Sequence, residues 1–482
     1  MRAAAAMDHD LIVIGGGAAG LGALRAALRA GADVALITDS PPGGDCTFTG
    51  CVPSKTLLAA LNDGLGFGAA AARARSTVAR VAASESVEVL RAAGATVIEG
   101  RARLVTHDTV AVGERRVSSP RTVIATGSRP AVPAVPGLEQ SRPLSSEDVF
   151  DLTEAPDRLC IVGGGATGCE MAHAFASAGT KVALLESQSR ILPDADPEAS
   201  AVIRGALESL SVEVLTSTRV AGVSAAAGAA PATSGEAAPE GAVSVLTRSS
   251  DQTAQGDRDD PGGAVACDKL LVAVGRAPRS EGLGLEELGV KVDDQGGVIT
   301  DDRMMTSLRG VYAAGDVTGR AMLSHAADEM GRIAAGNALG RPVAGRFQGA
   351  VTPRVVFPGP EVASVGVHRS AAPAGSRAAY LPLTEVDRAL MEQRTDGFIS
   401  IVAGPRRWLR NTGGGRILGA TIVAPRAGEM IAEVVLAMRA DVFAGRLAQA
   451  SHAYPTWSSG VQQAAAQFFG EIDGRQAGVI GA

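Results

Sequence analysis

Two copies of one pattern, each an apolar run followed by a glycine-rich turn and a helix, constrain the fold of this chain more than any other feature. The first copy spans residues 10–37 and the second spans residues 159–185. A constant offset of 148 residues relates Gly15 in the first copy to Gly163 in the second. In each copy the apolar run is typical of a buried parallel strand, and a second apolar run after the helix is typical of its neighbour. The sequence therefore predicts an α/β chain with two doubly wound units.

The glycines of each turn have separate tasks in a dinucleotide site. The first permits a tight turn, the second lets a pyrophosphate approach the backbone, and the third lets the helix pack on the strand. The helix that follows presents its N-terminal amides to the phosphates. One dinucleotide per copy is the simplest interpretation. The candidate cofactor-binding glycines are Gly15, Gly17, Gly20, Gly163, Gly165 and Gly168.

An acidic side chain ends the second strand of the second copy. Glu186 lies about 20 residues beyond the glycines, where a carboxylate binds a ribose 2′-hydroxyl and repels a 2′-phosphate. NADH is therefore favoured over NADPH, while Arg190 keeps NADPH as an alternative. The first copy has Thr38 at the corresponding place with Asp39 next to it, so these two residues are its candidate ribose contacts.

Two cysteines five positions apart follow the first copy by a few residues. A regular helix would separate residues i and i+5 by about 7.5 Å along its axis, whereas a disulfide requires Cα atoms roughly 4.4–6.8 Å apart. Gly50 supplies the backbone freedom to bring Cys51 closer to Cys46. A disulfide beside a cofactor is one interpretation, and two unrelated buried thiols are the alternative.

The motifs together resemble those of the class I pyridine-nucleotide disulfide oxidoreductases, the family of glutathione reductase, dihydrolipoamide dehydrogenase and mercuric reductase. The ordered set covers nearly the whole chain and is highly specific. Beyond the two glycine turns it consists of GGxCxxxGCxPSK at 43–55, ATGSRP at 125–130, VGR at 274–276, VYAAGD at 311–316 and FPGPEVASVG at 357–366.

The resemblance implies two Rossmann-like dinucleotide-binding domains and a C-terminal α+β dimerisation domain. FAD is expected in the first unit and NAD(P)H in the second. The expected bounds are 7–155 and 285–349 for the interrupted FAD-binding domain, 156–284 for the NAD(P)-binding domain and 350–482 for the dimerisation domain. Asp316 is expected to bond the ribityl chain of the flavin. The other cofactor-binding residues that the resemblance implies are Gly44, Thr126, Gly127, Gly275, Arg276 and Gly315.

The resemblance also assigns an electron path from the nicotinamide through the flavin to a redox-active disulfide. Cys51 is then the sulfur nearer to the flavin, and Cys46 is the outward-facing thiol that exchanges with a substrate. Lys55 and Glu170 are expected to form an ion pair beside flavin N5. Glu170 lies in an apolar helix, where a carboxylate needs a partner, and a surface role for either residue is the alternative.

The C-terminal segment departs from the family pattern. Where similar enzymes have a catalytic histidine followed by a glutamate, this chain has Tyr454 and Ser459. A tyrosine with a pKa of about 10 stays protonated where a histidine shuttles protons, and losing a general acid–base costs typically 10²–10⁴-fold in rate. His452 is no substitute, because two residues along an extended segment move a side chain by about 7 Å. Efficient turnover of ordinary disulfides is therefore not expected.

Three alternatives for the function remain open. Mercuric reductases carry an additional cysteine pair near the C-terminus to receive the soft ion, and no cysteine follows Cys267 here, so Hg(II) is a second choice. A quinone is another non-disulfide acceptor. A structural or regulatory subunit that binds FAD and NADH belongs to a different class, but it would not need a redox pair. Cys160, Cys169 and Cys267 are interpreted as small core residues.

A homodimer is implied by the resemblance, with the active site shared across the interface. Tyr454 and Trp457 would then face the partner subunit's Cys46, where their rings could form a platform for a flat acceptor. Interface packing is the alternative for both rings. A formal net charge of −6 gives no support for nucleic-acid binding, and no metal site is expected.

Apolar stretches are too short for a membrane span, which takes about 18 residues or more. Five cysteines and a redox-cycling disulfide indicate the cytoplasm. Residues 222–264 are interpreted as a β-meander with lengthened turns, inserted in the second unit. Residues 405–415 are interpreted as the long turn of a hairpin.

The sequence thus predicts an FAD-dependent, NADH-preferring disulfide oxidoreductase with a small-molecule acceptor.

Overall fold

The computed structural model describes residues 7–225, 243–250, 263–341, 345–405 and 411–480. The chain divides into two compact units, each assembled from separate stretches. Unit 1 consists of Met1–Val132, Ser145–Thr153 and Gly275–Gly349. Unit 2 consists of Pro133–Leu144, Glu154–Val274 and Ala350–Ala482.

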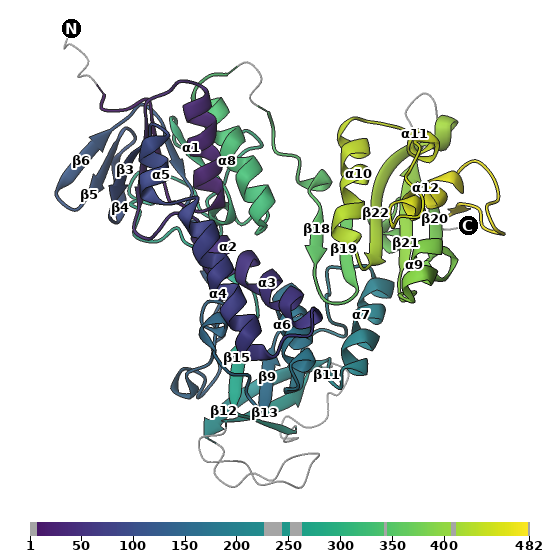
Figure 1. Cartoon of the computed structure of the whole chain (residues 1–482). Helices are drawn as coiled ribbons and strands as arrows, with labels where there is room; N and C mark the ends of the chain where they lie inside the picture. The colour runs from purple at the N-terminus through teal and green to yellow at the C-terminus, as the bar shows by residue number, and fades with distance from the viewer. Residues whose placement is uncertain (1–6, 226–242, 251–262, 342–344, 406–410, 481–482) are drawn as a thin grey trace. The chain divides into compact units, whose positions relative to one another are not determined.

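A five-stranded parallel sheet forms the centre of unit 1 (Figure 1). Its order is β17-β7-β1-β2-β3, so the first strand of the chain lies in the middle. This doubly wound arrangement confirms the α/β fold class for the first glycine turn. The strands are β1 (Leu11–Ile14), β2 (Val34–Thr38), β3 (Thr96–Glu99), β7 (Thr122–Ile124) and β17 (Val311–Ala313).

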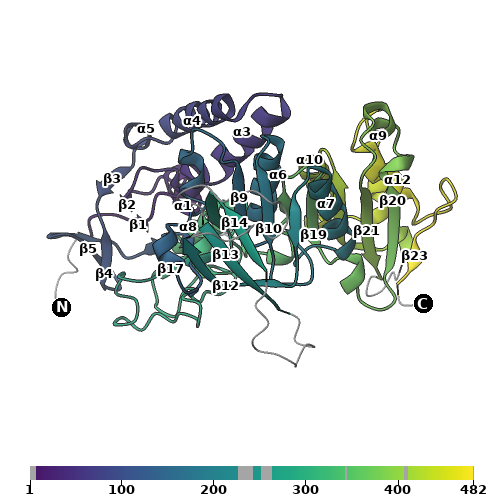
Figure 2. The ribbon, with the colours of Figure 1, turned by 90° about the horizontal axis from the view of Figure 1, so that it is seen from below.

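Both faces of this sheet are covered, which explains the uninterrupted apolar run at its centre. Leu11 and Val13 belong to a buried cluster with α1 (Ala18–Arg29) and α8 (Ser324–Ala338), which lie side by side in Figures 1 and 2. Ile12 and Ile14 point to the other face. There they meet an antiparallel sheet of β4 (Ala102–Thr106), β5 (Thr109–Val112) and β6 (Arg115–Ser118).

The remaining elements of unit 1 connect these layers. The strands β8 (Ser128–Pro130) and β16 (Arg276–Pro278) form a short antiparallel pair. The helices are α2 (Gly44–Phe48), α3 (Cys51–Asn62), α4 (Phe67–Ala83) and α5 (Val87–Ala92).

Unit 2 repeats the parallel architecture around the second glycine turn. Its four-stranded sheet has the order β11-β10-β9-β15, with all pairs parallel. The strands are β9 (Arg158–Val162), β10 (Lys181–Leu185), β11 (Glu213–Leu215) and β15 (Lys269–Val272). The helices are α6 (Ala166–Ser177) and α7 (Pro197–Ser209), and the Asp196 carboxylate caps α7 by accepting from the Glu198 amide.

The predicted meander is confirmed as a three-stranded antiparallel sheet. It consists of β12 (Thr218–Ala225), β13 (Val243–Ser249) and β14 (Ala264–Cys267). The lengthened turns that the sequence predicts, at 226–242 and 251–262, lie outside the described residues.

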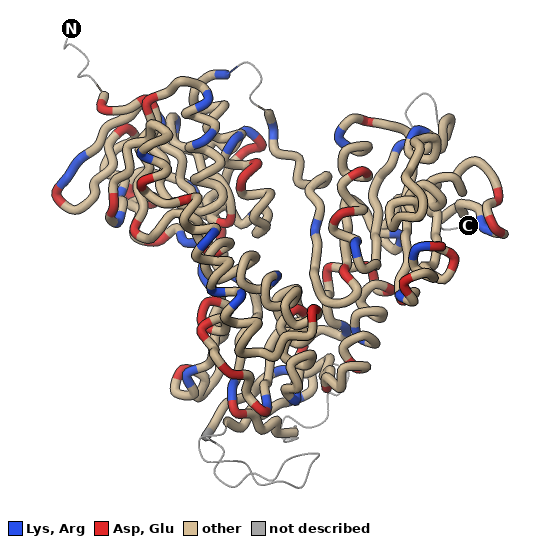
Figure 3. The backbone as a smooth tube through the Cα atoms, in the orientation of Figure 1, with Lys and Arg blue, Asp and Glu red and all other residues tan. Residues whose placement is uncertain are grey.

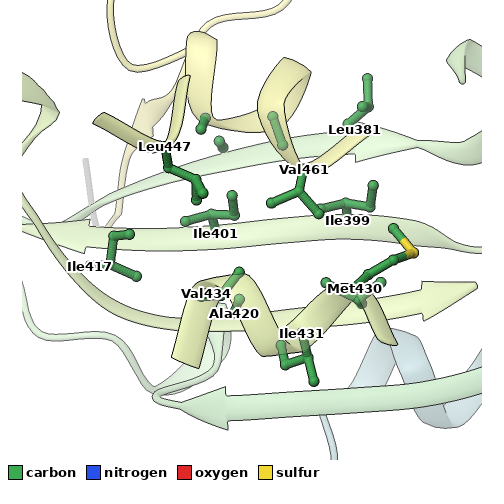
Figure 4. Close-up of a cluster of buried hydrophobic side chains, with 14 of the residues drawn as sticks. Leu381, Ile399, Ile401, Ile417, Ala420, Met430, Ile431, Val434, Leu447 and Val461 are labelled. Atoms are coloured by element: carbon green, nitrogen blue, oxygen red, sulfur yellow. The ribbon is translucent and has the colours of Figure 1, made fainter. Parts of the chain in front are cut away.

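The C-terminal part of unit 2 is an α+β arrangement, in which helices pack on an antiparallel sheet. Its sheet has the order β18-β19-β22-β21-β20-β23 and is antiparallel. Figure 4 shows how Ile399 and Ile401 of the sheet pack against Met430, Val434 and other side chains of the covering helices. The strands are β18 (Arg354–Val356), β19 (Glu361–Gly366), β20 (Arg377–Pro382), β21 (Phe398–Gly404), β22 (Arg416–Ala424) and β23 (Gly478–Val479). The helices are α9 (Asp387–Glu392), α10 (Ala427–Arg439), α11 (Ala444–Gln449) and α12 (Ser459–Ala466).

The predicted hairpin is also confirmed, because β21 pairs with β22 in antiparallel register from Phe398 and Val423 to Gly404 and Arg416. Part of its turn, residues 406–410, lies outside the described residues. Basic and acidic residues are interspersed along the backbone of both units (Figure 3). Within the described ranges, no helix is long and apolar enough to cross a membrane.

Candidate active site

The first glycine turn is pressed against its own sheet. Gly15 has a φ of +105°, and a Cβ there would lie 2.2 Å from the carbonyl oxygen of Ala125. A Cβ at Gly20 would lie 1.8 Å from the carbonyl oxygen of Gly15. Real Cβ atoms do not approach so closely, so both positions require glycine. The turn can therefore direct its backbone at a ligand from the start of α1.

The second glycine turn has the same geometry. Gly163 has a φ of +107°, and a Cβ at Gly168 would lie 1.8 Å from the carbonyl oxygen of Gly163. A Cβ at Gly165 would meet no protein atom within 4 Å, so the backbone there is open to a pyrophosphate. Both turns thus have the shape that a dinucleotide requires.

Glu186 lies at the end of β10, where the sequence predicts the ribose contact. Its side chain is buried, and one carboxylate oxygen accepts the amide of Gly164 at 2.7 Å. The other oxygen accepts the amide of Gln188 at 2.7 Å and the hydroxyl of Ser187 at 3.2 Å. These donors hold the carboxylate against the glycine turn, and its contact with a ribose 2′-hydroxyl stays a prediction.

The corresponding residues in unit 1 are arranged differently. Thr38 is buried at the end of β2, and its hydroxyl donates to the carbonyl oxygen of Ser40 at 2.7 Å. Asp39 is exposed next to it. Of the two predicted ribose contacts in this unit, Thr38 is therefore buried, whereas the carboxylate of Asp39 is accessible to a ligand.

The cysteine segment begins directly on the first glycine turn. The amide of Gly43 donates to the carbonyl oxygen of Gly16 at 2.8 Å. Gly44, the first residue of α2, has a φ of +62°, and a Cβ there would lie 2.7 Å from the Cα of Gly17. Gly44 and Gly17 were both predicted as cofactor-binding residues, and the fold brings their backbones into contact.

A break in the helix brings the two cysteines together. The helix α2 ends at Phe48 and α3 begins at Cys51, so Cys46 and Cys51 do not lie on one continuous helix. A Cβ at Gly50 would lie 2.8 Å from the carbonyl oxygen of Asp45, which makes glycine necessary at this corner. The break removes the axial separation of a regular helix, and the two thiols share a hydrogen bond.

The environment of the two sulfurs is strongly asymmetric. The hydrogen bond from Cys46 lowers the pKa of Cys51 to about 5, and the Ser324 hydroxyl and the Lys55 charge act in the same direction. The same hydrogen bond and burial raise the pKa of Cys46 well above its usual range. Cys51 is therefore the thiolate of the reduced pair and Cys46 the neutral thiol.

Ser324 is a site residue that the sequence reasoning missed. It is the first residue of α8, and its hydroxyl lies 3.4 Å from the sulfur of Cys51. The helix N-terminus adds a partial positive charge at this point, which favours a thiolate. A hydroxyl residue at the start of a predicted helix is a visible signal, but only the packing of α8 on α1 directs it to the cysteines.

A polar network connects the cysteine helix with other predicted cofactor residues of unit 1. Arg276 forms an ion pair with Asp45, the residue before Cys46, and donates to the Ser128 hydroxyl at 2.7 Å. The Ser128 hydroxyl in turn donates to Asp316 at 2.7 Å. Burial raises the pKa of Asp316, and the charge of Arg276 opposes that shift.

Other predicted residues of unit 1 border this network. The Thr126 hydroxyl donates to the carbonyl oxygen of Arg279 at 2.6 Å. Three glycines are in the left-handed region, where glycine is favoured, with φ values of +74° at Gly127, +119° at Gly275 and +82° at Gly315.

Lys55 and Glu170 belong to different units, so their pairing stays a prediction. Lys55 lies on α3, where its charge acts on Cys51. Glu170 is buried on α6 and accepts the amide of Phe357 at 3.1 Å. The buried Glu170 carboxylate is therefore hydrogen-bonded within its own unit, whether or not it also pairs with Lys55.

Tyr454 and the nearby His452 are both engaged in hydrogen bonds in the C-terminal segment. The Tyr454 ring is 69% exposed, and its hydroxyl donates to Asp387 at 2.9 Å, which raises its pKa. The two nitrogens of His452 lie 2.9 Å from the carbonyl oxygen of Ala450 and 2.7 Å from a carboxylate oxygen of Glu433. Both hydrogen-bonding positions of this imidazole are therefore occupied.

The sequence predicts that the rings of Tyr454 and Trp457 form a platform for a flat acceptor, and this prediction is wrong for Trp457. Trp457 is buried in the hydrophobic cluster of the C-terminal sheet and does not present its ring to solvent. Its apolar surface is used by the core, and only Tyr454 remains exposed. Among the described residues, no group of three or more His, Cys, Asp or Glu side chains could hold a metal ion.

Comparison with known proteins supports the same assignment across the chain. Residues 9–331 match the model of the pyridine nucleotide-disulphide oxidoreductase family, and residues 352–465 match that of its dimerisation domain. The chain is 34% identical to a dihydrolipoyl dehydrogenase of Thermus scotoductus, over 95% of this chain and 96% of that protein. It is 33% identical to a mercuric reductase of Acidithiobacillus ferrooxidans, over 96% of this chain and 83% of that protein.

A solved structure is similar over the same extent. The HOCl-induced flavoprotein disulfide reductase RclA of Escherichia coli superposes with a TM-score of 0.80 at 26% identity. The superposition covers 94% of this chain and 98% of that one.

Replacing Ser324 by Ala is expected to raise the pKa of Cys51 by about one pH unit, because a hydrogen bond to a charged group contributes roughly 1.5–3 kcal/mol and one pH unit corresponds to about 1.4 kcal/mol. The pH dependence of Cys51 alkylation in the reduced protein, followed by mass spectrometry, measures this shift. In the wild type the rate should fall only as the pH drops through about 5.

Ser54→Ala is the matched control, because the Ser54 hydroxyl donates to the backbone carbonyl of Cys51 rather than to its sulfur. An unchanged alkylation profile in Ser324→Ala, or an equal shift in Ser54→Ala, would remove Ser324 from the site.

Proposed function

Because this chain belongs to the pyridine nucleotide-disulphide oxidoreductase family, whose enzymes depend on FAD, we propose that it carries electrons from NADH through FAD to the Cys46–Cys51 disulfide and on to a small-molecule acceptor. The observation that carries the proposal is the asymmetric cysteine pair, with Cys51 as a thiolate and Cys46 as its hydrogen-bonded neighbour. A structural subunit that only bound the cofactors would not need this pair.

In this proposal each glycine turn belongs to a domain that binds one cofactor. Residues 7–155 and 285–349 bind FAD, residues 156–284 bind NADH, and residues 350–482 form the dimerisation domain. FAD, when bound, supplies the carrier that connects a two-electron donor to a disulfide. Gly44 and Asp316 support the placement of FAD, because Gly44 contacts the first glycine turn and Asp316 accepts from Ser128 in unit 1.

The cysteines divide the thiol chemistry between them. Reduction of the disulfide by two electrons and one proton leaves a thiolate on Cys51 and a thiol on Cys46. Lys55 and the Ser324 hydroxyl stabilise the thiolate, and the pairing of Lys55 with Glu170 is part of the proposal. Cys46 is the group that would attack an incoming disulfide, but its raised pKa makes it a weak nucleophile unless a base takes its proton.

The absence of a histidine base at position 454 limits the kinds of acceptor that this site can reduce. The dimerisation-domain match supports a homodimer, in which we propose that Tyr454 faces the partner subunit's Cys46. The Tyr454 hydroxyl is a poor base because it is protonated and bonded to Asp387. His452 is held by Glu433 and Ala450. We therefore favour an acceptor that is reduced without an imidazole at this position.

Two kinds of acceptor meet that condition. The first is a disulfide whose leaving thiol has a low pKa, since exchange with such a disulfide is faster for any attacking thiol and can offset the weak nucleophilicity of Cys46. The second is a non-disulfide acceptor, a quinone or a metal ion such as Hg(II), and the exposed Tyr454 ring favours a flat molecule. The cytoplasmic location predicted from the cysteine content stays a prediction.

Glu186→Gln is expected to lower the preference for NADH over NADPH by about 10-fold or more, because the carboxylate that repels a 2′-phosphate becomes neutral while an acceptor oxygen remains. The ratio of kcat/KM for NADH to kcat/KM for NADPH measures this preference. The ratio should fall because kcat/KM for NADPH increases. A variant that loses activity with both nucleotides equally would point to a purely structural task for Glu186 at the glycine turn.

The acceptor is tested by NADH oxidation against low-molecular-weight disulfides, quinones and Hg²⁺. Restoring the family's acid–base pair with Tyr454→His and Ser459→Glu should raise turnover of alkyl disulfides by about 10-fold or more. Tyr454→Phe is the control and should change turnover by less than about twofold. Wild-type protein that reduces alkyl disulfides as fast as the restored variant would contradict the argument from the missing base.

Cys46→Ser separates the two kinds of acceptor. Disulfide reduction should disappear in this variant. If quinone reduction persists at the wild-type rate, electrons leave without the exchange thiol, and the non-disulfide function is the correct one.

A further inference from the structure

Two cysteines outside the active site lie side by side in unit 2. Cys160 is on the central strand β9, and Cys267 is the last residue of β14. Both are buried, as the sequence predicts for small core residues, and their thiols share a hydrogen bond. They belong to one buried cluster, with exposures of 0% and 1%.

The pair bridges two sheets. Cys160 shares a face of the parallel sheet with Leu185 and Leu270, and this face is covered by Val245 of the three-stranded sheet. Figure 2 shows β12, β13 and β14 together beside β9 and β10, and β14 is in contact with β9. A bond between the two sulfurs would therefore fasten one sheet to the other.

The backbone holds Cys267 firmly at this position. The amide of the next residue, Asp268, donates to the carbonyl oxygen of Arg158 at 3.0 Å, and the two side chains form an ion pair at 2.7 Å. Arg158 is two residues before Cys160 and Asp268 directly follows Cys267, so this contact fixes the backbone close to both cysteines.

The two thiols differ in reactivity in the same sense as the catalytic pair. The hydrogen bond from Cys160 lowers the pKa of Cys267, and the charge of Arg158 acts in the same direction. The same hydrogen bond and burial raise the pKa of Cys160. Cys267 is thus the better nucleophile, and Cys160 is positioned to resolve any product formed on it.

We propose that Cys160 and Cys267 form a second redox pair. A peroxide oxidises this pair to a disulfide, which links the parallel sheet covalently to the three-stranded sheet. The Cys267 thiolate attacks hydrogen peroxide and becomes a sulfenic acid with release of hydroxide. The Cys160 thiol then displaces water from it to form the S–S bond. In total two thiols lose two electrons and two protons, and one peroxide becomes two waters.

This site is separate from the proposed electron path, because neither cysteine belongs to the Cys46–Cys51 segment. Both sulfurs are buried, so oxidation requires a local opening of β14, an edge strand of its sheet. Closure should therefore be at least about 10-fold slower than oxidation of the accessible active-site pair. The disulfide also joins residues that are far apart in the chain, which restricts the unfolded state.

The test uses the full-length, FAD-loaded protein, treated with hydrogen peroxide, then denatured, alkylated and mapped by tandem mass spectrometry without reduction. We expect a Cys160–Cys267 disulfide in addition to Cys46–Cys51. The melting temperature should rise by roughly 5–8 °C and fall again with dithiothreitol.

Cys169 provides the matched control, because it is equally buried in the same unit but donates its hydrogen bond to the carbonyl oxygen of Gly164. Cys169→Ala should keep the new disulfide, and Cys267→Ala should lose it together with the rise in melting temperature. The proposal is overturned if Cys160 and Cys267 of the peroxide-treated wild type are alkylated on denaturation to the same extent as Cys169. This readout does not depend on whether Cys267→Ala folds.

Discussion

The hydrogen bond between Cys46 and Cys51 is the interaction on which the chemistry of this protein depends. It exists because the chain breaks its helix at Gly50, where a side chain would collide with the carbonyl of Asp45. The break is in turn anchored by Gly43 and Gly44, which lie on the first glycine turn. A sulfur pair that is fixed to the backbone of a dinucleotide site has its distance from the cofactor determined by the fold.

The surroundings of the pair give its two sulfurs different tasks. Ser324, at the start of α8, and Lys55 stabilise a thiolate on Cys51. Arg276 neutralises Asp45 beside Cys46. No comparable arrangement for proton transfer is found in the described C-terminal segment, where Tyr454 and His452 are both engaged in hydrogen bonds of their own. These contacts support the proposal that the acceptor is reduced without an imidazole at position 454.

Much of this fold could be predicted from the sequence, because glycine turns after apolar strands permit few structures. The strands β1, β2, β9 and β10, the three-stranded meander and the C-terminal hairpin all follow from local pattern. Contacts between distant segments could not be predicted in this way. Ser324 reaches Cys51 only through helix packing, Trp457 is buried by the C-terminal core, and Cys160 meets Cys267 only because two sheets stack.

Anaerobic addition of NADH to the FAD-loaded protein tests the central claim most directly. With one equivalent of NADH per FAD, the electrons should end on the cysteine pair. The Cys51 thiolate against oxidised flavin should then give a long-wavelength absorption band that is absent from Cys51→Ser. Direct bleaching of the flavin in the wild type, without that band, would contradict the account.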